Sequence, residues 1–247
     1  MKKKVLIWGL SSITIVLLIL LCLSLFWVLD SYPALENDPP VPFASVEIRE
    51  AGNHIAVLPQ GEPYNTGIIF YPGGKIEPEA YIPFFGPIAQ QGVAVYIVKM
   101  PLNLAFLGIN RAEAVISNTP DIERWIISGH SLGGAMACEW AAGNREAITG
   151  LILLASYPAE TTDLSDSGFQ ALSITAENDW ILNYNTYVNS QILLPEETQF
   201  LSIQGGNHAG FGYYGPQSGD GPQDLGYIQQ FLMSQNAILD FIRWTGP

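Results

Sequence analysis

The sequence predicts an α/β protein with a mostly parallel central sheet flanked by helices, and three observations support this fold class. From residue 67 onward, short apolar β-type runs alternate with helical patterns, which is typical of parallel strands joined by crossover helices. A strand, a tight glycine turn and a helix follow one another over residues 124–143. The chain of 247 residues, with 11 Tyr, 11 Phe and 6 Trp, is long and aromatic enough for one large domain with a substantial core.

Charge and cysteine content exclude several classes of protein. The formal net charge is −13 and Lys plus Arg total only 10, so the chain lacks the basic surface that nucleic-acid binding requires. Its cysteines, Cys22 and Cys138, lie in an N-terminal apolar run and in a predicted helix. We expect no disulfide between them, and we interpret Cys138 as a small buried apolar residue.

The N-terminus predicts a membrane anchor over residues 1–30. Lys2, Lys3 and Lys4 precede an uncharged run from Val5 to Leu29. A helix of this length extends about 37 Å, enough to cross a hydrocarbon core of about 30 Å. A cleaved signal peptide stays open as an alternative, although no small-residue cleavage site follows the run. The lysines favour a cytoplasmic N-terminus, so we expect a single-pass protein with its domain outside the cytoplasm.

Beyond the anchor, a proline-rich linker covers residues 31–42 and the predicted domain covers residues 43–247. Residues 44–50 and 54–58 alternate apolar and polar side chains around Ala51-Gly52-Asn53, which predicts an antiparallel hairpin at a sheet edge. His54 belongs to that hairpin, and we interpret it as an edge residue without a catalytic role.

The remaining elements follow in the order expected of a parallel sheet. Pro83 and Pro87 lie inside the first predicted helix, which must therefore start late, kink or break. The predicted strands cover residues 67–71, 93–99, 124–128, 148–156, 171–175 and 199–203, and the predicted helices cover residues 77–91, 111–117, 132–143 and 225–244.

The strongest chemical signal is Gly129-His130-Ser131-Leu132-Gly133, directly after the apolar run that ends at Ile127. It matches the G-x-S-x-G nucleophile elbow, in which a strained turn between strand and helix exposes the serine hydroxyl. The glycines are needed where strand and helix approach too closely for a Cβ atom. We therefore predict Ser131 as a nucleophile, with His130 pointing away from the apex of the turn.

A serine nucleophile needs an imidazole base and a carboxylate that orients it. With His54 on the hairpin and His130 inside the elbow, His208 is the remaining histidine, in a glycine-rich loop just after the last predicted strand. Asp179 follows the preceding strand by a short loop, so it should emerge at the same edge of the sheet. The other candidates for the carboxylate are Asp163 and Asp166, which precede that strand, and the glutamates Glu177, Glu196 and Glu197.

The order of nucleophile, acid and base, each after a successive strand, resembles the α/β-hydrolase superfamily over roughly residues 43–247. Tyr71-Pro72-Gly73-Gly74-Lys75, together with Gly205-Gly206-Asn207-His208, is similar to its small, dienelactone-hydrolase-like members. Those members carry a cysteine nucleophile, so lactone hydrolysis is not implied here. The short interval between residues 158 and 170 leaves no room for a large cap, which implies a rather open site.

The oxyanion formed during acyl transfer should be bound by the N–H of Leu132 at the helix N-terminus. The resemblance places a second donor after the strand that ends at Tyr71, and we expect Gly73 first and Gly74 second, because Pro72 has no N–H. The alternative is that Gly73 and Gly74 only reverse the direction of the chain and bind no oxyanion. We predict that Tyr71, Phe106 and Phe211 contact the substrate. The alternative for Tyr71 is an aromatic side chain packed at the end of a strand. The alternative for Phe106 and Phe211 is that their apolar loops cover the core.

The sequence therefore predicts a membrane-anchored serine hydrolase that cleaves a carboxylic ester or thioester through an acyl-enzyme. No spacing of His, Cys, Asp or Glu predicts a metal site, and no dinucleotide-binding loop predicts a cofactor. Two alternatives stay open: an acyltransferase with the same triad, and a non-catalytic membrane-tethered binding module of the same fold.

Overall fold

A computed structural model describes residues 14–20, 24, 30–37, 39–61 and 64–245. The chain divides into two compact units, Met1–Ser31 and Tyr32–Pro247. In the first unit, residues 14–20 are helical. Across the described ranges, no helix is both long and apolar enough to cross a membrane. Most of the predicted anchor, and Cys22 with it, lies outside the described residues.

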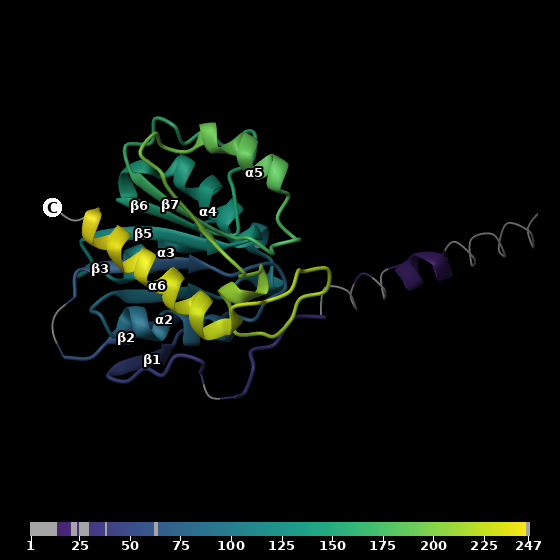
Figure 1. The fold of residues 1–247 in the computed structure, drawn as a ribbon, viewed down its shortest axis with the longest axis horizontal. Coiled ribbons are helices and arrows are strands. Elements are labelled where there is room, and N and C mark those ends of the chain that lie inside the picture. Colours follow the sequence, from purple (N-terminus) through teal and green to yellow (C-terminus); the bar gives the residue numbers. More distant parts are fainter. Residues whose placement is uncertain (1–13, 21–23, 25–29, 38, 62–63, 246–247) are drawn as a thin grey trace, which may run out of the picture. The chain divides into compact units, whose positions relative to one another are not determined.

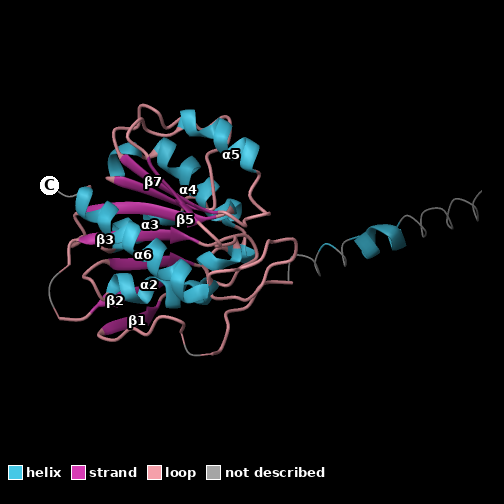
Figure 2. Cartoon of the chain, viewed as in Figure 1, coloured by secondary structure: helices cyan, strands magenta, loops and turns pink. Residues whose placement is uncertain are grey.

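The second unit is built on an eight-stranded sheet, seen with its covering helices in Figures 1 and 2. The strand order is β1-β2-β4-β3-β5-β6-β7-β8. The strands are β1 (Val46–Glu50), β2 (His54–Pro59), β3 (Thr66–Tyr71), β4 (Ala94–Val98), β5 (Arg124–His130), β6 (Gly150–Leu154), β7 (Gln170–Ala176) and β8 (Gln199–Ile203). The α-helices are α2 (Ile82–Ala89), α3 (Arg111–Asn118), α4 (Leu132–Gly143), α5 (Tyr184–Ser190) and α6 (Gly226–Trp244).

The direction of the strands confirms the mostly parallel sheet. Strands β3 to β8 pair in parallel, whereas β1 pairs antiparallel with β2 and β2 antiparallel with β4. The predicted edge hairpin is therefore correct. His54 begins β2, and its Nδ1 lies 2.8 Å from the side-chain oxygen of Asn53. Because β3 to β8 all run the same way, the loops that follow them gather at one edge of the sheet.

Helices cover both faces of the sheet, as Figure 1 shows for α6 and α2 on one face and α3 and α4 on the other. The two-residue period of the strands distributes their side chains between the two cores. In β3, Ile68 and Phe70 pack with α2 and α6, while Ile69 and Tyr71 pack with α3 and α4. Buried on both faces, β3 to β7 are nearly continuous apolar runs, which explains why they are visible in the sequence.

The predicted helix over residues 77–91 is divided in the structure. It starts as a 3-10 turn, Pro78–Tyr81, and continues as α2 from Ile82. Pro83 is tolerated because it lies in the first turn, where its missing N–H has no partner to lose. Pro87 lies inside α2 and removes one hydrogen bond there. The two prolines therefore delay and weaken this helix, as expected.

Helix α5 is not predicted by the sequence pattern. It begins after Asn183, whose side chain accepts a hydrogen bond of 3.1 Å from the N–H of Thr186 and so caps the first turn. The helix is short and continues as a 3-10 turn, Gln191–Leu193. Residues 158–169, by contrast, form turns and irregular backbone with no helix or strand. The short helix near the predicted carboxylate therefore follows β7, and the segment before β7 contains no helix.

Candidate active site

Ser131 is held in a strained conformation at the junction of β5 and α4. Its φ of 52° is unusual for a residue with a side chain. Two hydrogen bonds from β6 and the loop after it hold the strained residue: its N–H donates to the carbonyl oxygen of Leu154 at 2.9 Å, and the hydroxyl of Ser156 donates to its carbonyl oxygen at 2.7 Å. The turn is thus fixed from the neighbouring strand, with the geometry predicted for a nucleophile elbow.

The glycines of the elbow allow the close approach of strand and helix. A Cβ atom on Gly129 would lie 2.5 Å from the carbonyl carbon of Gly133, and one on Gly133 would overlap the carbonyl oxygens of Tyr71 and Pro72. Backbone atoms cannot move away cheaply, so a side chain at either position would displace α4 or β3. These glycines are therefore required by contact with neighbouring backbone.

Asp179 and His208 form a buried pair at the carboxyl ends of β7 and β8. The Nδ1 atom of His208 lies 2.8 Å from Oδ2 of Asp179, and their side chains are 2% and 1% exposed. The second oxygen, Oδ1, accepts the N–H groups of Ile181 and Leu182 at 3.0 and 2.8 Å. Because a carboxylate only accepts hydrogen bonds, the proton lies on Nδ1 of His208 and the lone pair on Nε2.

The loops that carry this pair are fastened to each other and to α6. The N–H of Asn178 donates to the carbonyl oxygen of Gly206 at 2.9 Å, which joins the loop after β7 to the loop after β8. The side chain of Gln230, fully buried in α6, accepts the N–H of Asn207 at 3.1 Å and donates to its carbonyl oxygen at 2.8 Å. The backbone before His208 is therefore clamped by a single amide side chain.

Ser131 and His208 line the same cavity, which has a volume of about 190 Å³ and is partly open to solvent. Asp179 lies behind His208 and does not line it. The three residues named from the sequence are therefore brought to one edge of the sheet. The other lining residues are Leu132, Ala135, Ala155, Ser156, Tyr157, Ile181, Leu182 and Asn183.

His130 lies against His208 within a hydrogen-bonded chain that sequence reasoning missed. The two imidazole rings have centroids 4.6 Å apart. The hydroxyl of Tyr81 accepts the N–H of Gly73 at 3.0 Å and lies 2.9 Å from Nδ1 of His130. With its oxygen accepting from Gly73, the hydroxyl is free to donate to Nδ1.

The pKa values of Tyr81 and His130 agree with a proton that lies on the Tyr81 hydroxyl and is donated to Nδ1 of His130. Burial, and then the neighbouring His208, hold the pKa of His130 well below its usual value, and burial raises the pKa of Tyr81. His130 is therefore neutral, and Tyr81 keeps the proton that it donates. As a result, His130 adds no positive charge beside His208.

The hydrogen bond to Tyr81 changes the order expected for the oxyanion donors. Gly73, the first choice from the sequence, already donates its N–H inside the protein. Gly74, the second choice, has no such partner among the described residues, and a Cβ atom built on it would lie 3.1 Å from Cδ2 of Leu132. Gly74 and the side chain of Leu132 are therefore neighbours, and of the two glycines it is Gly74 whose N–H stays available for an oxyanion.

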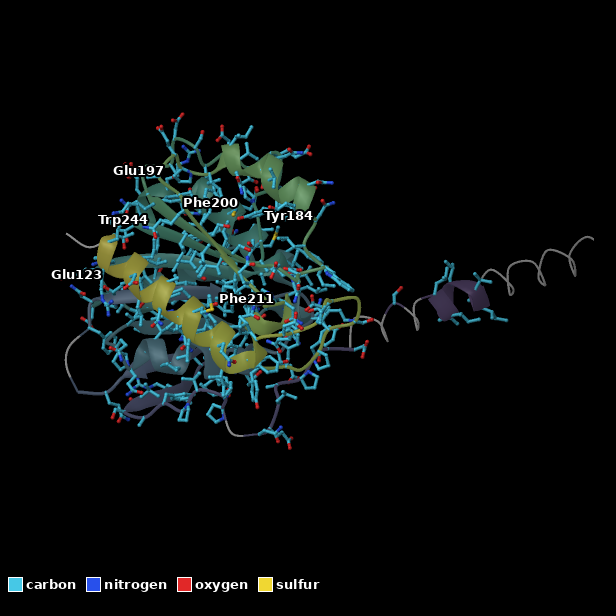
Figure 3. All side chains as sticks on the ribbon, viewed as in Figure 1. Glu123, Tyr184, Glu197, Phe200, Phe211 and Trp244 are labelled. Atoms are coloured by element: carbon cyan, nitrogen blue, oxygen red, sulfur yellow. The ribbon has the colours of Figure 1, made fainter. Side chains whose placement is uncertain are left out.

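None of the three residues expected to contact substrate lines the cavity. Tyr71 is fully buried, and its hydroxyl contacts the carbonyl oxygen of Ile109 on the α3 side of the sheet. Phe211, labelled in Figure 3, is also fully buried and packs on His130 with ring centroids 5.8 Å apart. Phe106 is 53% exposed on a different loop. Tyr71 and Phe211 thus belong to the core, which is the alternative named for them, and a substrate contact of Phe106 stays a prediction.

Part of the apolar lining of the cavity comes instead from Ile181 and Leu182, just before α5, with Asn183 beside them. The sequence carried one signal for them, since three apolar residues directly follow Asp179 and precede an Asn that can cap a helix. In the described part of the chain, no three His, Cys, Asp or Glu side chains cluster in a way that could hold a metal ion.

Residues 67–231 match the model of the alpha/beta hydrolase family. A search of curated protein sequences gave no match. Solved structures with a similar fold include Est1E from Butyrivibrio proteoclasticus (15% identity, TM-score 0.60, covering 82% of this chain and 99% of that one). The esterase domain of a Rhodothermus marinus protein (13%, 0.61, 82% and 100%) and a protein from Thermoplasma acidophilum described as a predicted CIB-like hydrolase (15%, 0.58, 80% and 99%) are also similar. At these identities the likeness shows the fold.

Proposed function

The chain belongs to the alpha/beta hydrolase family, and from that premise we propose that it is a serine hydrolase that cleaves a carboxylic ester or thioester through an acyl-enzyme. One observation carries the proposal: the buried pair of Asp179 and His208 adjoins a cavity that also exposes Ser131. A structural role for the pair alone would not require a strained serine at the same cavity. The esterase names of two structures with similar folds agree with this reaction class.

In the proposed reaction, Nε2 of His208 takes the proton of the Ser131 hydroxyl as its oxygen attacks the carbonyl carbon of the ester. Asp179 holds the imidazole by Nδ1 and stabilises the imidazolium that forms. The same proton then goes to the departing alcohol or thiol, which leaves an acyl-Ser131. Water then attacks the acyl carbon while Nε2 of His208 takes a proton from it. The bond between the acyl carbon and Oγ of Ser131 breaks, the proton passes from His208 to Oγ, and the carboxylic acid leaves.

The negative charge on the carbonyl oxygen would be bound by the N–H groups of Leu132 and Gly74. Leu132 is the first residue of α4, so its N–H has no partner within the helix and the helix dipole favours an anion there. Gly74 lies beside the side chain of Leu132, so the two proposed donors belong to neighbouring residues. Two such donors together contribute several kcal/mol to the transition state, at about 3 kcal/mol for each donor.

The proposal is tested by hydrolysis of p-nitrophenyl acetate and butyrate. Ser131→Ala should remove the enzyme-dependent rate, since no acyl-enzyme can form. Ser128→Ala is the matched control, because Ser128 lies on the same strand and its buried hydroxyl has no hydrogen-bond partner within the described residues. Equal activity in the two variants would refute the assignment of the nucleophile.

We also propose that the domain is tethered to a membrane by its N-terminal segment, outside the cytoplasm. The support is the sequence: Lys2 to Lys4 precede the uncharged run Val5–Leu29, and a proline-rich linker follows. The protein should then sediment with membranes, resist extraction by carbonate and dissolve in detergent. Release by carbonate would contradict the tether without affecting the proposed chemistry.

A further inference from the structure

The segment after Asp179 carries a row of exposed apolar side chains. Trp180, Tyr184, Val188 and Ile192 recur every four residues and are 69%, 66%, 42% and 80% exposed. Tyr184 and Val188 lie one turn apart on the same side of α5, Trp180 lies in the loop before the helix, and Ile192 lies in the 3-10 turn after it. Ile181, 36% exposed, lies beside Trp180 in the chain. We call Trp180, Ile181, Tyr184, Val188 and Ile192 the α5 stripe, and Figure 3 labels Tyr184 within it.

The α5 stripe is continuous with the proposed active site. Ile181, Leu182 and Asn183 line the cavity that contains Ser131 and His208. The same short segment thus forms the wall of the cavity and then becomes the exposed stripe. Exposed apolar side chains also occur on α6, at Ile228, Leu232 and Met233, but none of these lines the cavity.

The cavity is too small to enclose a large substrate. Its volume is about 190 Å³, whereas pockets that enclose drug-sized ligands have about 300–1,000 Å³. The cavity is partly open, so a group too long for it must continue outside. The α5 stripe begins at its wall and offers apolar contact to such a group.

The chemistry of the segment selects a neutral, apolar group. Residues 180–194 contain no Asp, Glu, Lys or Arg, although the whole chain carries a formal charge of −13. An anionic group finds no positive partner on this segment and a cationic group no negative one. Flat aromatic and branched aliphatic side chains instead remove alkyl or aryl surface from water.

We propose that the α5 stripe binds an apolar arm, alkyl or aryl, of the ester substrate while the ester group lies at Ser131. The inference rests on the proposed hydrolase function and names the substrate class for that site: esters with a long or bulky uncharged arm. Each CH₂ buried against the stripe should raise kcat/KM up to about fourfold, so a longer arm should raise kcat/KM until the stripe is covered.

The test compares the full-length protein with two matched triple variants, all reconstituted in identical phospholipid nanodiscs. One variant carries Tyr184→Gln, Val188→Gln and Ile192→Gln, which removes the stripe beyond the cavity wall. The control carries Ile228→Gln, Leu232→Gln and Met233→Gln on α6, three exposed apolar residues away from the cavity. Glutamine is used in both because it is a good helix former.

The readout is kcat/KM for two ester series, p-nitrophenyl esters with acyl chains from acetate to octanoate and alkyl acetates with chains from methyl to octyl. In at least one series the unmodified protein should prefer the long members. The stripe variant should lower the ratio of the long to the short member by about tenfold or more, and the α6 variant should leave that ratio unchanged.

An unchanged ratio in both series overturns the inference, and so does an equal fall in the α6 variant. If the stripe variant keeps its chain-length preference but changes oligomeric state or vesicle binding, the stripe is a protein or lipid interface and the inference is wrong. If the unmodified protein hydrolyses no ester at all, the proposed function itself fails. The two failures are therefore distinguishable.

Discussion

The Nδ1 atom of His208 lies 2.8 Å from Oδ2 of Asp179, with both side chains nearly closed off from solvent. This pair joins the ends of two adjacent strands, β7 and β8, and fixes which nitrogen of His208 faces the cavity. Because Oδ1 of Asp179 is held by two backbone N–H groups, the carboxylate cannot rotate without losing them. The orientation of the imidazole is therefore set before any substrate binds.

Asp179→Asn should lower kcat for ester hydrolysis by about 1,000- to 10,000-fold with little change in KM. The amide oxygen can still accept the N–H groups of Ile181 and Leu182, so its NH₂ group then faces Nδ1 of His208. That arrangement favours the tautomer with the proton on Nε2, which cannot accept the proton of Ser131. Asp166→Asn, an exposed carboxylate that precedes β7, is the control and should retain full activity. Comparable losses in both variants would contradict this role of Asp179.

Gly133→Ala should destabilise the protein by about 3 kcal/mol or more, because the new Cβ atom would overlap the carbonyl oxygens of Tyr71 and Pro72. The paired change is Gly143→Ala, at the end of the same helix, where the new methyl group would have no neighbouring atom within 4 Å. Alanine is the better helix former, so that variant should be unchanged or more stable by up to about 1 kcal/mol. Urea unfolding measures both, and similar stabilities would show that the elbow is not as tightly packed as described.

The stability of the protein should fall as the pH drops below about 6.5, partly because of His130. Burial lowers the pKa of His130 in the folded protein, so below about 6.5 the unfolded chain binds a proton that the folded protein does not. The free energy of unfolding then decreases by at most about 1.4 kcal/mol per pH unit for this one group. His54 has a lowered pKa from partial burial and contributes in the same direction.

His130→Gln should make the dependence of stability on pH between pH 6.5 and 5 less steep, and His54→Gln should reduce it by a smaller amount. Urea unfolding at several pH values measures the slope for each variant. A His130→Gln slope equal to that of the unmodified protein would mean that His130 does not stay neutral in the fold.

Gln230→Leu should lower both stability and kcat. Leucine has a similar size but leaves the buried N–H and carbonyl oxygen of Asn207 without partners, at about 1–3 kcal/mol for each unpaired group. The loop that carries His208 should then lose its fixed position, which lowers kcat more than it raises KM. The neighbouring Gln229 is exposed, so Gln229→Leu is a control for the change in composition. Equal behaviour of the two variants would rule out the clamp.

Much of the fold could be predicted because the buried strands of a parallel sheet are continuous apolar runs. Strand β8 and helix α4 have the predicted bounds, and the other predicted strands differ by a few residues at their ends. The placement of Asp179 and His208 followed from the same fact, since loops after parallel strands meet at one edge. Helix α5 was not recognised because it has only seven residues, Tyr184–Ser190, most of them polar.

The side-chain partners within the site were not predictable. Tyr81 and His130 are 49 residues apart, and only the fold brings the hydroxyl within 2.9 Å of the imidazole. The same hydroxyl accepts the N–H of Gly73, so Gly73 is not available to an oxyanion. Gly74 lies beside the side chain of Leu132. For the same reason, an aromatic near the site, such as Phe211, could not be distinguished in the sequence from an aromatic in its wall.

The most direct test of the account is the position at which a fluorophosphonate probe reacts. The central claim is that His208 activates the Ser131 hydroxyl, so the probe should attach to Ser131 as identified by peptide mass spectrometry. His208→Ala should lose the labelling, and Ser128→Ala should keep it. No adduct on the folded protein, or an adduct at another residue, would contradict the account.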